Sequence, residues 1–115
     1  MNRDEFMRLY DNDIVKLTED EQRDITVVSA FRCDKNTKCT VFMEELAELT
    51  VELSKWIRGE GSKVDILEEM ADVQICLNQM KLIFGYEQEA IDRAIEVKLW
   101  REEGRCKTHD SDRKD

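Results

Sequence analysis

The chain has 115 residues, a formal net charge of −9 at pH 7 and 39% charged residues. This length predicts a single domain, and the negative charge argues against a nucleic-acid polymer as a partner, because its phosphates would be repelled. The sequence has no apolar run near the ~20 residues that span a bilayer, and its start, MNRDEF, lacks a signal-peptide core. We therefore expect a cytoplasmic protein that does not bind membranes.

Apolar periodicity predicts an all-α fold. Proline is absent, and the four glycines fall where helical periodicity breaks, as C-terminal caps do. The predicted helices cover, in chain order, about residues 2–11, 18–33, 40–58, 62–85 and 88–103. We expect one helical domain over residues 1–105 and a disordered tail over 106–115, because the tail is charged and has no apolar anchor.

Capping residues mark where three of these helices begin. Thr18 followed by Glu21 is a capping-box pattern, and Ser62 followed by Asp65 repeats it. Thr40 can cap the third helix after DKNTK, which is predicted to be a polar turn. The third and fourth helices are predicted to form an antiparallel hairpin, because a glycine pair lies between them.

Carboxylates occupy matching positions on the two helices of this hairpin. Glu45 and Glu48 are three residues apart and share a helix face, and Glu69 and Asp72 do the same on the next helix. In an antiparallel hairpin that turns near residues 58–59, the two pairs lie at the same height. The sequence therefore predicts that four carboxylates converge.

Such a cluster is suited to a metal ion. Close carboxylates cannot all stay ionised without a large cost in free energy unless a cation joins them. The donors are all oxygen, which favours Mg²⁺, or Mn²⁺, over Zn²⁺. A solvated acidic helix face explains the same spacing without any metal. A di-iron carboxylate bundle is disfavoured, because the sequence has no Glu-x-x-His motif.

The motifs at these positions resemble a known signature. EELAE at 44–48 and EMAD at 69–72 are similar to the EExxE…ExxD pattern of the MazG-like, all-α nucleoside triphosphate pyrophosphohydrolases, and KLWREEGR closes the last predicted helix. The resemblance covers about residues 40–105. Phosphoribosyl-ATP pyrophosphohydrolases share the fold and the carboxylate metal site of this family. They usually carry a His shortly after ExxD, where this chain has VQICL.

The resemblance implies a helical bundle centred on the hairpin and Mg²⁺-dependent hydrolysis of a nucleoside triphosphate to the monophosphate and pyrophosphate. It makes Glu45, Glu48, Glu69 and Asp72 the metal ligands. Lys98 and Arg101 would bind the substrate phosphates, although the same basic residues could instead compensate the dipole of the last helix. Glu44, four residues before Glu48, is the candidate for orienting or deprotonating the attacking water.

Assembly is also expected, because the wide apolar faces of these helices exceed what a chain of 115 residues can cover. We predict a homodimer or a tetramer. The competing interpretation of the whole chain is a non-catalytic helical assembly module whose carboxylates are surface decoration. A response of thermal stability to Mg²⁺ would separate the two, because specific binding stabilises the fold.

Overall fold

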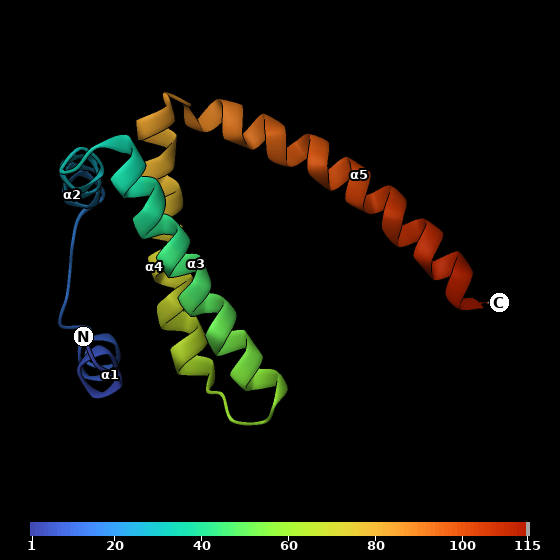
Figure 1. The fold of residues 1–115 in the computed structure, drawn as a ribbon, viewed down its shortest axis with the longest axis horizontal. Helices are drawn as coiled ribbons and strands as arrows, with labels where there is room; N and C mark the ends of the chain where they lie inside the picture. The colour runs from blue at the N-terminus through green and yellow to red at the C-terminus, as the bar shows by residue number, and fades with distance from the viewer. Residues whose placement is uncertain (115) are drawn as a thin grey trace. The chain divides into compact units, whose positions relative to one another are not determined.

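The computed structural model describes the backbone of residues 1–114 and the side chains of residues 1–107. The described chain is helical and contains no strand, which confirms the all-α prediction (Figure 1). Its helices, in chain order, are α1 (Arg3–Asp11), α2 (Glu19–Ala30), α3 (Lys35–Ile57), α4 (Lys63–Phe84) and α5 (Gln88–Lys114). They fall into two compact units, Met1–Phe84 with α1 to α4, and a second that begins at Gly85 and holds α5.

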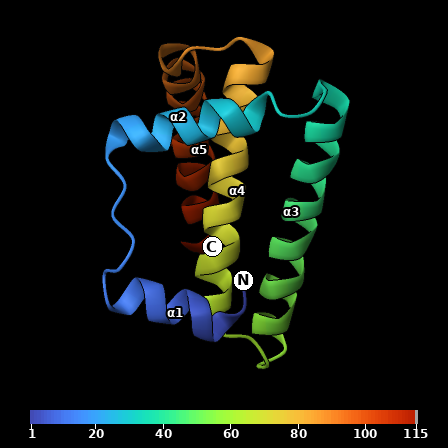
Figure 2. The same cartoon turned by 90° about the vertical axis from the view of Figure 1, so that its left-hand side faces the viewer.

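In the first unit, α3 and α4 lie side by side and are joined by the loop over residues 58–62 (Figures 1 and 2). The two shorter helices pack on α4. Figure 2 shows α2 lying across α4 near its C-terminal end and α1 near its N-terminal end. The pair α3 and α4 is therefore the scaffold on which this unit is built.

α2 and α4 begin after Thr18 and Ser62, whose side chains cap the free backbone N–H groups of the first turn. Glu21 N donates to Thr18 Oγ1 at 3.1 Å and Thr18 N donates to Glu21 Oε1 at 3.2 Å, which confirms the capping box. Asp65 N donates to Ser62 Oγ at 3.2 Å, so Ser62 also caps its helix. The carboxylate of Asp65 binds Arg3 instead of completing a second box.

The predicted start of the third helix at Thr40 is wrong. Asp34 is the N-cap of α3, because its side chain accepts a hydrogen bond from Thr37 N at 2.7 Å. Thr40 lies inside the helix and its hydroxyl donates to the carbonyl of Asn36 at 3.1 Å. The predicted polar turn is thus the first turn of α3, which places Lys38 on a helix.

Glycine is required twice in the loop between α3 and α4. Gly59 has a φ of +77°, which side chains disfavour. Gly61 lies against the end of α3, where a Cβ would come within 2.6 Å of Trp56 N. These two residues let the chain reverse within a few residues, so that α4 begins directly beside α3.

The last helix extends further than predicted. Gly104 does not end α5, which continues to Lys114. Two ion pairs bridge the glycine along the helix, Arg105 with Glu102 at 3.8 Å and Lys107 with Glu103 at 2.8 Å, and pairs at this spacing stabilise a helix. The predicted disordered tail, 106–115, falls largely outside the residues whose side chains are described.

Few side chains of the described chain are buried. The buried apolar residues are Ala30 and Cys76, and the buried polar residues are Lys38 and Gln79. Ile25, Val28 and Phe31, whose spacing predicted the second helix, are 55%, 70% and 62% exposed. Other apolar residues of the first unit, among them Phe42, Leu49, Ile66 and Val73, are half-buried, so its fully buried positions hold small and polar groups. None of the described helices is both long and apolar enough to cross a bilayer.

Candidate metal centre

Four carboxylates come together between α3 and α4. One oxygen from each of Glu45, Glu48, Glu69 and Asp72 lies within 4.8 Å of the other three. We call these four residues the acidic cluster. Each helix contributes two of them from adjacent turns, as the sequence spacing predicts. Two long helices joined by a short loop therefore bring the four groups to one place.

Burial and mutual repulsion disfavour ionisation of three members of this cluster, Glu45, Glu69 and Asp72. Burial, followed by the charges of Glu48 and Asp72, raises the pKa of Glu69 from its usual 4.5 to about 7. The same causes raise the pKa of Glu45, and burial with the charge of Glu48 raises that of Asp72. Glu45 Oε2 and Glu69 Oε2 are buried and accept no hydrogen bond from a described residue, and the same is true of Glu52 Oε2 outside the cluster. Each of these oxygens lacks the partner that a buried polar atom normally has.

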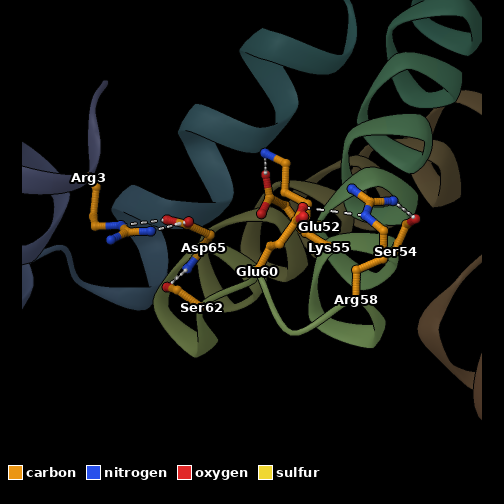
Figure 3. Close-up of polar contacts among 8 residues, drawn as sticks. All are labelled: Arg3, Glu52, Ser54, Lys55, Arg58, Glu60, Ser62 and Asp65. Atoms are coloured by element: carbon orange, nitrogen blue, oxygen red, sulfur yellow. Dashed lines mark hydrogen bonds and ion pairs between the residues drawn. The ribbon is translucent and has the colours of Figure 1, made fainter.

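Two carboxylates one helical turn away from the acidic cluster, Asp65 and Glu52, form ion pairs with basic side chains. Arg3 Nε donates to Asp65 Oδ1 at 2.8 Å, and this bond holds the pKa of Asp65 below its usual range. Lys55 Nζ lies 3.3 Å from Glu52 Oε1 (Figure 3). Among the residues whose side chains are described, no Lys or Arg forms an ion pair with any member of the acidic cluster. Asp65 and Glu52 thus each have a cationic side chain as partner, whereas the four cluster carboxylates have none among the described residues. The ammonium group of Met1 acts to lower the pKa of Asp72, but burial and the charge of Glu48 outweigh it.

The acidic cluster fits a divalent cation. Opposite oxygen ligands of one Mg²⁺ stand about 4.2 Å apart, because each lies ~2.1 Å from the ion. Adjacent ligands in the same octahedron stand only ~3.0 Å apart, so oxygens within 4.8 Å of one another would move closer together to share one ion. A bound cation would also neutralise the repulsion and give the two orphaned oxygens a partner. The acidic cluster could therefore hold a metal ion.

The other predicted site residues lie outside the acidic cluster. Glu44 is exposed on α3 and contributes no oxygen to the group, although its charge helps to raise the pKa of Glu45. Lys98 and Arg101 are exposed residues of α5, in the second unit. Lys98 lies on the same side of α5 as Ile91 and Leu99. No ion pair involves Lys98 or Arg101 within the described side chains.

Sequence reasoning missed a second polar group. Lys38 and Gln79 are buried, and both bind the hydroxyl of Ser29 on α2. Lys38 lies two turns before Glu45 on α3, and Gln79 lies two turns after Asp72 on α4. The matching spacing from the acidic cluster is visible in the sequence once α3 is known to begin before Lys38. No pattern in the sequence predicts that Ser29 of α2 contacts Lys38 and Gln79.

Comparisons with known proteins find no counterpart: no family model, curated protein or solved structure matches the chain. The resemblance to the MazG-like signature therefore rests on the residues of the two motifs.

Proposed function

We propose that the chain is a Mg²⁺-dependent nucleoside triphosphate pyrophosphohydrolase, which converts a ribo- or deoxynucleoside triphosphate to the monophosphate and pyrophosphate and so clears the nucleotide pool. The acidic cluster carries this proposal, because its four oxygens lie together and no described Lys or Arg pairs with them, whereas Asp65 and Glu52 each have such a partner. Mg²⁺ with few protein ligands usually completes its shell with water and substrate phosphates. The two motifs that supply the cluster, EELAE and EMAD, are those that resemble the MazG-like family.

The finer fold that goes with this function is a MazG-like bundle built on an antiparallel hairpin of α3 and α4. Support comes from the side-by-side packing of the two helices and from the short glycine-containing loop that joins them. In such a bundle the ligand pairs are held by regular helices, which position side chains more rigidly than loops do.

Each residue then has a defined task. Glu45, Glu48, Glu69 and Asp72 hold the ion, which when bound neutralises phosphate charge and lowers the pKa of a water. Glu44 is exposed beside the ligands and accepts a proton from the attacking water, whose oxygen bonds to the α-phosphorus. The bond from that phosphorus to the bridging oxygen breaks, and pyrophosphate leaves.

The substrate phosphates are bound by Lys98 and Arg101 of α5. Both are exposed cations that form no ion pair within the described side chains of α5, whereas Arg105 lies 3.8 Å from Glu102. Unpaired cations are the ones free to make charge-assisted hydrogen bonds to a phosphate.

A homodimer or tetramer is the active assembly. Support comes from large apolar side chains that are open to solvent in both units, among them Ile57 at 83%, Trp100 at 77% and Val28 at 70% exposure. Exposed apolar surface of this kind marks interaction sites. Sedimentation at micromolar concentration is expected to give a dimer or larger species, and a stable monomer would refute this part of the proposal. A cytoplasmic location stays a prediction.

The activity is tested by offering the purified chain a panel of ribo- and deoxynucleoside triphosphates with Mg²⁺ or with EDTA, and scoring release of pyrophosphate. We expect pyrophosphate from at least one triphosphate with Mg²⁺ and none with EDTA. If no triphosphate is cleaved and Mg²⁺ leaves the thermal stability unchanged, the non-catalytic assembly module becomes the better interpretation.

A further inference from the structure

Three polar side chains meet beneath α2. Gln79 Nε2 lies 2.9 Å from Ser29 Oγ, and Lys38 Nζ lies 3.5 Å from the same oxygen. Lys38 is only 9% exposed and Gln79 only 5%. We call Ser29, Lys38 and Gln79 the donor cluster. It joins α2, α3 and α4, and it lies where α2 crosses the C-terminal part of α4 (Figure 2).

The donor cluster has more hydrogen-bond donors than acceptors. An ammonium carries three N–H groups and a primary amide carries two, whereas the hydroxyl of Ser29 is the acceptor shared by both. No described carboxylate forms an ion pair with Lys38. Burying a charge without an anionic partner is costly. The donor cluster is therefore suited to a ligand that brings acceptor atoms.

Its position relates it to the acidic cluster. Lys38 precedes Glu45 by two turns of α3, and Gln79 follows Asp72 by two turns of α4, so the two clusters are offset by roughly 10 Å along the helices. Cys76, a small buried residue, lies between them on α4. A nucleoside extends over a comparable distance from its α-phosphate. A nucleotide whose phosphates lie at the acidic cluster can thus place its base at the donor cluster.

Access requires α2 to move, and its composition makes that movement inexpensive. The inner face of α2 carries small residues, including Ser29 and Ala30. The large apolar residues of α2 are already exposed, Ile25, Val27 and Val28 within the helix and Phe31 at its C-cap. Lifting α2 from α4 therefore exposes little additional apolar surface.

We infer that Lys38, Gln79 and Ser29 form the subsite that reads the base, and that they select bases with an oxo group, uracil and guanine, over cytosine and adenine, which carry an amino group there. This inference rests on the proposed function. An oxo group of the base accepts a hydrogen bond from Lys38. An amino group at the same position is itself a donor, so it would face the ammonium of Lys38 without forming a hydrogen bond.

The test compares kcat/KM for dUTP, dGTP, dCTP and dATP in wild type and in Lys38→Met. We expect wild type to prefer the two oxo bases by about tenfold or more, as a well-placed base contact provides, and Lys38→Met to lose the preference. Lys35→Met is the matched control, because Lys35 lies one turn earlier on α3, is exposed and contacts the Phe84 ring at 5.0 Å. It is expected to keep the preference.

A structural role for Lys38 predicts a different result. If Lys38 serves only to hold α2, Lys38→Met lowers the melting temperature and leaves the base preference unchanged, which would overturn the inference. A base-reading lysine is not needed for folding, so its replacement by an apolar residue of similar length is expected to leave the melting temperature equal or higher. Gln79→Glu gives Lys38 an ionic partner without changing shape, and it is expected to abolish the preference as well.

Failure of the inference can be told from failure of the proposed function. Cleavage of all four triphosphates within about threefold refutes base selection and leaves the hydrolase intact. If no triphosphate is cleaved, the shift in melting temperature caused by dUMP and dGMP is compared with that caused by dCMP and dAMP. A larger shift with the oxo bases that disappears in Lys38→Met supports the subsite, and equal shifts refute it.

Discussion

Replacing Glu69 by glutamine is predicted to stabilise the metal-free protein. In the acidic cluster, burial and the charges of Glu48 and Asp72 raise the pKa of Glu69 to about 7. Above that pH the folded protein must hold an ionised carboxylate that the unfolded chain would solvate. Glutamine has nearly the same shape and no charge, so Glu69→Gln removes this cost.

The sign and size of the change in unfolding free energy follow from the linkage between protonation of Glu69 and folding. Because the pKa of Glu69 is higher in the folded state than its usual 4.5, the folded state holds the proton more tightly. Its stability is then greatest below about pH 4.5 and falls as the pH rises through about 7. A shift of this size corresponds to at most ~3 kcal/mol, and solvent screening at a partly exposed carboxylate lowers this value. We expect Glu69→Gln to raise the free energy of unfolding by about 1–3 kcal/mol at pH 8 and by almost nothing at pH 4.

Urea unfolding in EDTA at both pH values, followed by tryptophan fluorescence, measures this difference. Glu68→Gln is the matched control, since Glu68 is the adjacent carboxylate of α4 and is not part of the acidic cluster. Adding Mg²⁺ at pH 8 should reverse the order, because the wild type gains stability from the ion and the variant loses a ligand. Destabilisation of metal-free Glu69→Gln at pH 8, or an equal gain from Mg²⁺ in both proteins, would refute the reasoning.

Three further predictions concern other parts of the chain. Lys98→Ala and Arg101→Ala are each expected to lower kcat/KM for pyrophosphate release by at least about tenfold without changing the melting temperature, and unchanged kinetics in both would leave these residues a helix-dipole role. Asp34→Ala is expected to cost about 1 kcal/mol in urea unfolding through loss of the N-cap, whereas no effect would contradict the start of α3. Gly61→Ala should destabilise the fold, because its Cβ would lie 2.6 Å from the backbone of α3, whereas Gly104→Ala, where a Cβ meets nothing within 4 Å, should raise the melting temperature; equal responses would count against the loop geometry.

Local signals in the sequence were sufficient to predict much of the fold. The capping box at Thr18 and the cap at Ser62 predicted two helix starts, because those hydrogen bonds join residues three apart. Asp34 was overlooked, since Thr40 offered an equally good cap in front of the first apolar residues. Gly104 was taken as a helix end, but α5 continues through it, and two ion pairs that span the glycine stabilise the helix there.

The acidic cluster was predictable because two regular helices joined by a short loop bring matching positions to the same height. The donor cluster was not, because it depends on where α2 crosses α4, and the apolar period of α2 marks its exposed side. Whether Lys98 and Arg101 act on the same substrate depends on contacts between distant parts of the chain, which spacing along one helix does not specify.

The most direct test of the central claim is Mg²⁺-dependent pyrophosphate release by Glu48→Gln and Asp72→Asn, with Glu68→Gln as control. Both substitutions keep the side-chain shape and remove one carboxylate from the acidic cluster. We predict that the two variants fold at least as stably as wild type without metal, because each has one repelling charge fewer. We also predict that both lose the activity, because each lacks one carboxylate that binds the metal ion. Near-native activity in both variants would contradict the assignment of the acidic cluster as the metal site.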